Sequence, residues 1–172
     1  ADTIDVRPQA DPAAGVWIND GTVVSFNGGN GNFDDLNVSS RFGADALTLT
    51  PINGVTITAE GNQPSDGDSV LVNADANTTV TGLAVDGATV QVSGNSDIVL
   101  ETVESLLING QAADISLTVT GSGRFVHTPS ANVDAGTMQV ESLLAVGYVN
   151  LGAAATVTAD GMGGSDELVA FG

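Results

Sequence analysis

Aspartates set among glycine and asparagine are the residues of this sequence best suited to bind a ligand. Five of them stand in segments that predict loops: Asp34, Asp35, Asp66, Asp68 and Asp166. Calcium prefers carboxylate and backbone oxygens and needs about six to eight of them, which loops can bring together. The same aspartates could instead cap turns and keep the surface soluble. Calcium is therefore the one candidate cofactor, with these five residues as its candidate ligands.

Side chains that commonly carry catalysis are scarce. His127 is the only histidine, and no nucleophile-elbow phrase supplies a serine for it to activate. Cysteine and lysine are both absent, so thiol nucleophiles, zinc–thiolate sites and a phosphate-binding lysine are excluded. Paired aspartates could cleave a glycosidic bond, but Trp17 and Tyr148 are the only Trp and Tyr that could offer a sugar platform. The sequence predicts a protein that is not an enzyme.

The charge balance narrows the choice of partner. The chain carries 21 acidic residues against three arginines, for a formal net charge of −18. A nucleic acid would need a basic footprint, and an anionic membrane surface is disfavoured for the same reason. No apolar run approaches the roughly 18 to 20 residues that span a bilayer. We expect no nucleic-acid binding and no membrane insertion, and a location outside the cell or on its surface.

Alternation of apolar and polar residues with period two runs through most of the chain and predicts short strands. The clearest runs are 22–26, 55–58, 89–92, 115–119 and 156–158. Dipeptides that readily adopt positive φ stand between such runs, at 20–21, 53–54, 86–87 and 109–110. Glycine, asparagine and aspartate recur too often for a long helix. The sequence therefore predicts an all-β fold.

Two short phrases recur along the chain and indicate repeats. Asp-x-apolar begins at residues 2, 34, 45, 68 and 166, and Val-Glu-Ser-Leu-Leu occurs at 103–107 and 140–144. A single β-repeat domain is expected, with units near 1–43, 44–74, 75–111, 112–152 and 153–172, because such spacings are typical of repeat proteins. A parallel β-solenoid, or β-helix-like stack, fits recurring phrases best. An antiparallel β-sandwich is the alternative, since the uneven units and Asn-Gly dipeptides suit hairpins.

At these phrases the chain resembles the degenerate Asp/Gly-rich repeats of large secreted bacterial surface proteins, which are related to calcium-binding nonapeptide toxin repeats. The nonapeptide pattern Gly-Gly-x-Gly-x-Asp-x-apolar-x is nearly met at 161–169, where Met162 replaces a glycine. It is also nearly met at 28–36, where Phe33 is inserted before the aspartate. Neither copy has an intact nonapeptide beside it, as a regular calcium-binding roll would require. The resemblance implies an extracellular repeat protein with a structural, adhesive or surface-layer role.

The resulting hypothesis is a non-catalytic building unit of a cell-surface fibre, layer or stalk that assembles end to end through strand edges. The residues expected at these edges are Thr3, Ile4, Val6, Leu168, Val169 and Phe171. The partners would be copies of the chain or neighbouring repeats of a longer one. An adhesin-like module that binds a surface polysaccharide is the alternative. A fragment of a β-helical polysaccharide lyase is a weaker alternative that the scarcity of basic residues opposes.

Overall fold

Strands with alternating burial make up the regular structure of this chain. The computed structural model describes residues 3–8, 13–18, 22–27, 34–40, 43–62 and 67–171. Within these ranges every helix or strand is a β-strand, and the strands form two sheets of ten and seven members. The prediction of an all-β fold is therefore confirmed.

The ten-stranded sheet is here called the long sheet. In spatial order it contains β17 (Glu167–Ala170), β13 (Arg124–Pro129), β14 (Gly136–Val140), β15 (Val146–Val149), β11 (Ser105–Asn109), β7 (Ser69–Asn73), β5 (Ala46–Leu49), β1 (Thr3–Pro8), β2 (Ala13–Ile18) and β3 (Thr22–Asn27). The seven-stranded sheet is called the short sheet. In spatial order it contains β16 (Thr156–Gly161), β12 (Ser116–Gly121), β8 (Thr78–Ala84), β9 (Gly87–Val92), β10 (Ile98–Glu101), β6 (Thr56–Glu60) and β4 (Asp35–Ser39).

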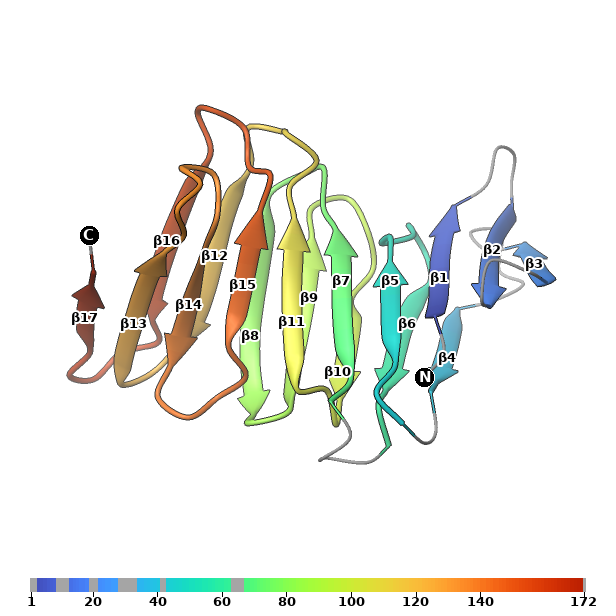
Figure 1. The fold of residues 1–172 in the computed structure, drawn as a ribbon, viewed down its shortest axis with the longest axis horizontal. Helices are drawn as coiled ribbons and strands as arrows, with labels where there is room; N and C mark the ends of the chain where they lie inside the picture. The colour runs from blue at the N-terminus through green and yellow to red at the C-terminus, as the bar shows by residue number, and fades with distance from the viewer. Residues whose placement is uncertain are drawn as a thin grey trace.

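The chain passes back and forth between the two sheets and stacks its strands in parallel ladders (Figure 1). In the long sheet β1, β5, β7, β11 and β15 are successive parallel neighbours. In the short sheet β4, β6 and β10 are parallel, as are β8, β12 and β16. Stacking of this kind defines a parallel β-solenoid. The solenoid prediction is confirmed, and the sandwich alternative is wrong.

Three antiparallel meanders interrupt the parallel stacking, namely β1–β2–β3, β8–β9–β10 and β13–β14–β15. Each adds two strands to one sheet, which explains the uneven spacing of the repeated phrases. Only the described turn dipeptide at 86–87 lies in a hairpin between two named strands, although 53–54 closes a single antiparallel bridge between Ile52 and Val55. The other two, at 53–54 and 109–110, lie where the chain leaves one sheet for the other. Corners between sheets also need positive φ, as Gly54 shows with a φ of 79°.

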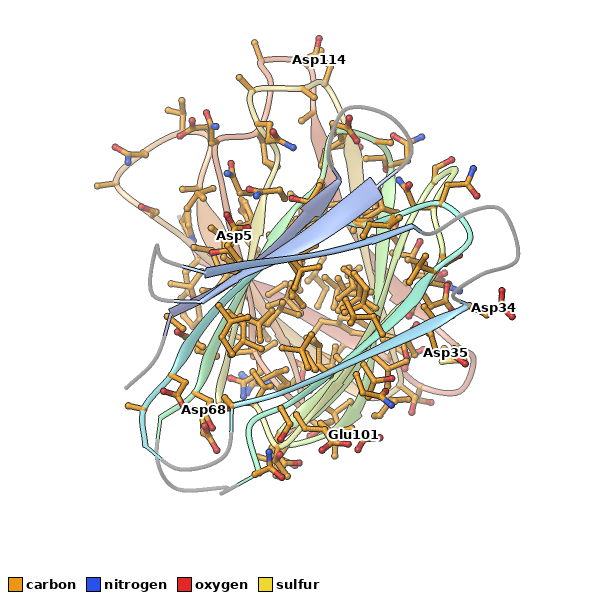
Figure 2. All side chains as sticks on the ribbon, turned by 90° about the vertical axis from the view of Figure 1, so that its right-hand side faces the viewer. Asp5, Asp34, Asp35, Asp68, Glu101 and Asp114 are labelled. Atoms are coloured by element: carbon orange, nitrogen blue, oxygen red, sulfur yellow. The ribbon has the colours of Figure 1, made fainter. Side chains whose placement is uncertain are left out.

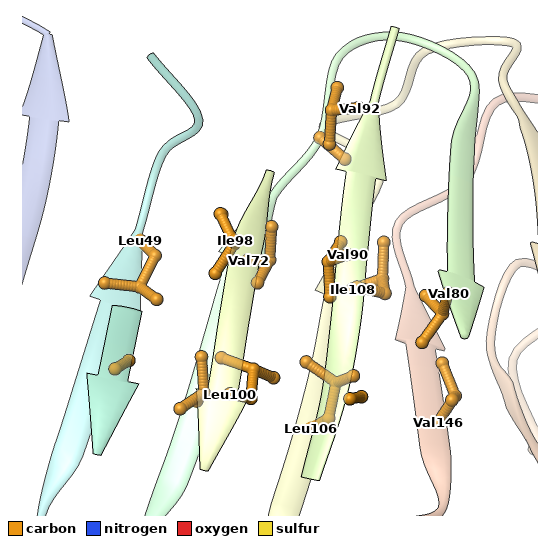
Figure 3. Close-up of a cluster of buried hydrophobic side chains, with 14 of the residues drawn as sticks. Leu49, Val72, Val80, Val90, Val92, Ile98, Leu100, Leu106, Ile108 and Val146 are labelled. Carbon is orange, nitrogen blue, oxygen red and sulfur yellow. The ribbon is translucent and has the colours of Figure 1, made fainter. Parts of the chain in front are cut away.

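Buried apolar side chains from strands of both sheets face the space between the sheets and form one continuous core. The long sheet contributes ladders such as Leu49, Val72 and Ile108, which occupy equivalent positions in adjacent coils. The short sheet contributes Ile98 and Leu100 opposite them (Figure 3). These side chains are almost fully buried. Apart from Phe125, Met138 and Tyr148, the core residues are aliphatic, and such side chains pack well between two sheets.

The two ends of the solenoid differ. At the C-terminal end the outermost strands, β16 and β17, follow each other in the chain, so the two sheets end together. At the other end β4 leads directly to β5, and the long sheet continues through β1, β2 and β3 beyond it (Figure 1). The long sheet therefore projects past the short sheet at this end.

The predicted edge residues lie on, or directly after, two different strands of the long sheet. Leu168 and Val169 belong to β17, which has a single neighbour, β13, in the described structure. The prediction of an edge at Thr3, Ile4 and Val6 is wrong, because β1 pairs with β5 on one side and β2 on the other. Ile4 and Val6 are buried in the core. The projecting hairpin β2–β3 covers the edge that β1 would otherwise offer.

Candidate functional site

The structure does not bring together the candidate calcium ligands that it describes. Asp34 and Asp35 are exposed at the start of β4, whereas Asp68 is buried before β7 at a different corner (Figure 2). Asp166 is exposed before β17, and Asp66 lies outside the described residues. Across the described ranges, no group of three or more His, Cys, Asp or Glu residues is placed to hold a metal ion.

The aspartate that begins the repeated phrase instead joins one coil to the next. Asp68 accepts a hydrogen bond at Oδ1 from the backbone N–H of Asp45, at 2.8 Å. Glu104 accepts one at Oε2 from the backbone N–H of Asp68, at 2.6 Å. The strands that follow these residues, β5, β7 and β11, are in register, so the three acidic residues occupy equivalent corners. Charge-assisted bonds of this kind are stronger than bonds between neutral groups.

The same device recurs at other corners. Asp166 accepts at Oδ1 from the N–H of Gly123 at 2.7 Å, and Asp114 accepts at Oδ1 from the N–H of Ala154 at 2.8 Å. In each case the acidic side chain reaches a neighbouring coil of the solenoid. Sequence reasoning selected Asp68 and Asp166 as metal ligands and missed Asp45, Glu104 and Asp114. The signal that identifies them is an acidic residue just before a strand.

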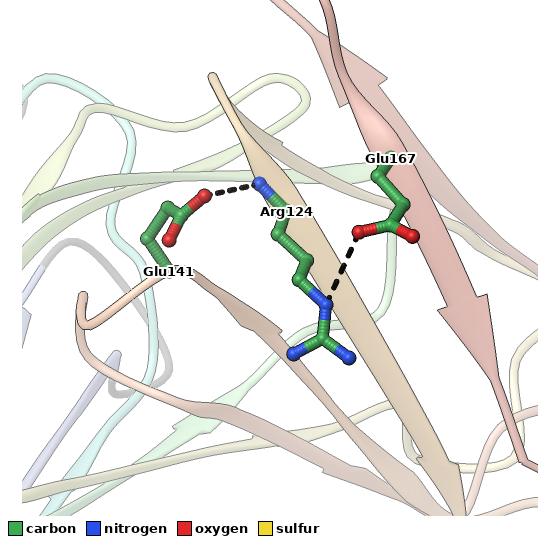
Figure 4. A network of polar contacts seen from close by, with 3 residues as sticks. All are labelled: Arg124, Glu141 and Glu167. Atoms are coloured by element: carbon green, nitrogen blue, oxygen red, sulfur yellow. Dashed lines mark hydrogen bonds and ion pairs between the residues drawn. The ribbon is translucent and has the colours of Figure 1, made fainter.

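The two identical Val-Glu-Ser-Leu-Leu segments have different structures. In the first, residues 105–107 lie in β11, whereas the second ends β14 and turns away at 141–143. Their glutamates nevertheless act alike, since Glu141 accepts at Oε1 from the backbone N–H of Arg124 at 2.6 Å (Figure 4). The recurring element is the corner carboxylate and not the strand that follows it.

Arg124 also forms an ion pair with Glu167, with Nε and Oε2 3.3 Å apart (Figure 4). Both side chains are more than half exposed. Water and salt screen such a pair, so its contribution to stability is at most about 1 kcal/mol. It links β13 to β17 at the C-terminal end, where Arg124 and Glu167 are register partners.

The single histidine packs beside the single tyrosine. His127 Nε2 and Tyr148 Oη are 2.7 Å apart, and the two rings are stacked with their centroids at 6.1 Å. Burial raises the pKa of the Tyr148 hydroxyl above its ordinary value. Both side chains line a cavity of about 270 Å³ at the C-terminal end of the solenoid. The pair therefore forms one wall of this cavity. That the chain is not an enzyme stays a prediction.

The core is open at the C-terminal end. Val157 and Ala159 of β16 line the cavity but are only half-buried, unlike their register partners Leu117 and Val119. Leu168 of β17 also lines it and is 60% exposed. Just beyond β17, Phe171 is 55% exposed. The apolar side chains of β16 and β17 are thus partly exposed at this end.

A larger hollow of about 840 Å³ lies on the side of the molecule between the loop at 131–134 and residues 148–157. Tyr148 is the only aromatic residue that lines it, and this side chain is 6% exposed. Carbohydrate sites commonly stack sugars on exposed aromatic faces. The hollow therefore offers a polysaccharide little to stack on.

Comparisons with protein-family models, curated proteins and solved structures found no match. The resemblance to repeats of secreted bacterial surface proteins therefore stays a prediction. In the part of the chain that the structure describes, no helix is long and apolar enough to cross a membrane.

Proposed function

We propose that this chain is a non-catalytic structural segment, a building unit of an extracellular fibre, layer or stalk that joins its neighbours through strand edges. The observation that carries the proposal is the open C-terminal end. There both sheets end together in strands with one described neighbour each, and apolar side chains of the core are left half-exposed. An edge of this kind is a template for strand addition.

The charge of the chain supports joining at the end and opposes joining along the sides. At a net charge of −18, two acidic flanks repel each other across any broad lateral contact. Backbone pairing at a strand edge uses N–H and C=O groups that every non-proline residue carries. Salt should therefore promote association by screening the repulsion.

The corrected edges change which residues carry this association. Thr3, Ile4 and Val6 lie inside the long sheet, so a neighbour at this end would meet β3 instead of β1. At the C-terminal end the residues proposed to meet a neighbour are still Leu168, Val169 and Phe171. They sit on β17 or directly after it.

Sedimentation velocity over a range of protein and salt concentrations tests the proposal. We expect weak association that becomes stronger as the salt concentration rises. The double substitution Leu168→Asp and Phe171→Asp should abolish this association, because two buried charges would face the incoming strand. Val85→Asp is the matched control, since Val85 is 68% exposed in the turn between β8 and β9. A chain that stays monomeric at millimolar concentration, or association that survives the double substitution, would remove self-assembly through this end.

A further inference from the structure

The last strand of the short sheet repeats an earlier one almost residue for residue. Residues 156–161 read Thr-Val-Thr-Ala-Asp-Gly, and residues 56–61 read Thr-Ile-Thr-Ala-Glu-Gly. The two segments also start alike: the N–H of Thr56 donates to the carbonyl of Asp34 at 2.8 Å, and the N–H of Thr156 donates to that of Ile115 at 3.0 Å. Strand β16 is therefore a structural copy of β6, with β12 in the place of β4.

On its other side β6 pairs in parallel with β10, and the register places Ile98 beside Ile57 and Leu100 beside Ala59. The N–H of Ile57 donates to the carbonyl of Asp97 at 3.0 Å. The N–H of Gly61 donates to that of Glu101 at 3.0 Å. The small side chain of Ala59 leaves room for the larger Leu100.

The equivalent groups of β16 point away from the molecule. The N–H groups of Thr156 and Met162 both donate toward the β12 side. Successive N–H groups of a strand point to opposite sides, so those of Val157, Ala159 and Gly161 face outward. Ala159 lines the cavity of about 270 Å³. The place that Leu100 fills beside Ala59 is open beside Ala159.

The long sheet shows the same correspondence between β17 and β7. Asp166 accepts from the N–H of Gly123, as Asp68 accepts from the N–H of Asp45. The N–H of Asp68 is in turn bound by the Glu104 carboxylate of the next coil. The N–H of the next residue, Glu167, donates toward β13, so the N–H of Asp166 faces the open side.

We propose that the C-terminal end binds a β-arch of a partner solenoid with the sequence pattern of β10 and β11. In this chain that pattern is Asp-Ile-Val-Leu-Glu-Thr-Val-Glu-Ser-Leu-Leu-Ile, residues 97–108. The first strand of the arch pairs in parallel with β16 and places its leucine over Ala159. Its second strand pairs with β17, and the glutamate before that strand accepts from the N–H of Asp166. This inference rests on the proposed structural role and names the partner for that same surface.

A second copy of the chain cannot occupy both edges at once. A copy that pairs its β3 with β17 holds its β4 away from β16, because β1, β2 and β3 project beyond β4. A copy that pairs its β4 with β16 would place the same three strands on top of β17. An arch has one strand for each sheet, so it satisfies both edges together.

Binding of a synthetic peptide with the sequence of residues 95–109 tests the proposal. Fluorescence anisotropy of the labelled peptide would be measured against the full chain in high salt, which screens the shared negative charge. We expect saturable binding, with slowed amide exchange at Val157, Ala159 and Gly161. A control peptide with aspartate in place of the leucines at 100 and 106 should not bind.

Two variants of the chain fix the location of the peptide. Ala159→Leu should weaken binding by about tenfold or more, because it fills the space meant for the leucine of the arch. Its unfolding temperature should stay equal or rise, since the new side chain enters an open cavity. Thr158→Leu is the matched control on the outer face of the same strand, and it should bind as the original chain does.

Absence of binding at millimolar concentration, equal binding of the control peptide, or unchanged binding by Ala159→Leu would each overturn the inference. The structural proposal fails separately. If the chain self-associates, the Leu168→Asp and Phe171→Asp double substitution abolishes this association, and the peptide does not bind, the structural proposal is supported and the arch is contradicted. A strictly monomeric chain that binds the peptide would keep the arch and remove self-assembly.

Discussion

The Oδ1 atom of Asp68 lies 2.8 Å from the backbone nitrogen of Asp45 and accepts its hydrogen bond at a corner where both residues are buried. The bond joins two successive coils of the long sheet. It gives the recurring Asp-x-apolar phrase a structural meaning, because the carboxylate of one coil satisfies a backbone donor of the coil before it.

Asp68→Ala is expected to lower the free energy of unfolding by about 1 to 3 kcal/mol, because it leaves the buried N–H of Asp45 without this acceptor. Asp68→Asn retains an oxygen at the same place and should cost less. Urea unfolding followed by circular dichroism measures both. Asp35→Ala, at an exposed position, is the control and should change stability by less than about 0.5 kcal/mol. Equal losses at residues 35 and 68 would contradict the role of the corner carboxylate.

Gly61→Ala is expected to destabilise the chain by about 3 kcal/mol, the upper part of the usual cost of overpacking. A Cβ at residue 61 would collide with the backbone oxygen of Thr102 and with the Asp68 carboxylate, and a backbone oxygen cannot move aside easily. Gly147→Ala is the control, since its Cβ would meet the flexible tip of Leu107 at 3.0 Å. Thermal unfolding compares the two. A Gly61→Ala chain as stable as Gly147→Ala would show that adjacent coils are not packed this closely.

Tyr148 should titrate above its ordinary pKa of 10.0 in the folded chain, because burial disfavours the tyrosinate. The stability that the neutral hydroxyl contributes is complete below the unfolded value, and it is lost as pH rises through the higher folded value. Tyr148 is the only tyrosine, so ultraviolet absorbance reports it alone. The same titration in concentrated urea supplies the reference. Coincident midpoints in the folded and unfolded chain would contradict the burial of this hydroxyl.

Calcium is expected to raise the unfolding temperature no more than magnesium at the same concentration. Asp34 and Asp35 share the corner before β4, whereas Asp68 and Asp166 lie at two other corners, so both ions act on the described candidates mainly by screening charge. Differential scanning calorimetry with each ion and with a chelator measures the effect. A rise specific to calcium that Asp35→Asn abolishes would instead establish a calcium site at the start of β4, since a ligand of the folded state must stabilise it.

Much of the fold follows from local features of the sequence. The runs at 55–58, 89–92 and 115–119 became β6, β9 and β12 with small shifts at their ends. Their apolar residues are buried, since a strand points alternate side chains to opposite faces. The Asp-x-apolar phrases at 45 and 68 indicated parallel stacking correctly, since β5 and β7 pair in register, whereas the two Val-Glu-Ser-Leu-Leu segments do not stack.

The candidate sites follow less directly from the sequence. Their loop context predicts Asp68 and Asp166 as metal ligands, yet the feature that gives them a role is the backbone N–H of the preceding coil. Ala159 carries no chemical signal in isolation. Its importance is visible only when β16 is compared with β6 and the neighbour of β6 is known.

The sequence by itself therefore determined many of the strands and the faces that they bury. Tertiary structure alone decided which strands became neighbours: β1 is interior because the β2–β3 hairpin covers it, and β16 and β17 became the open end. The physical reason is that either edge of a strand offers the same backbone donors and acceptors to any neighbour. Alternation specifies which face turns to the core, but it does not specify which strand lies alongside.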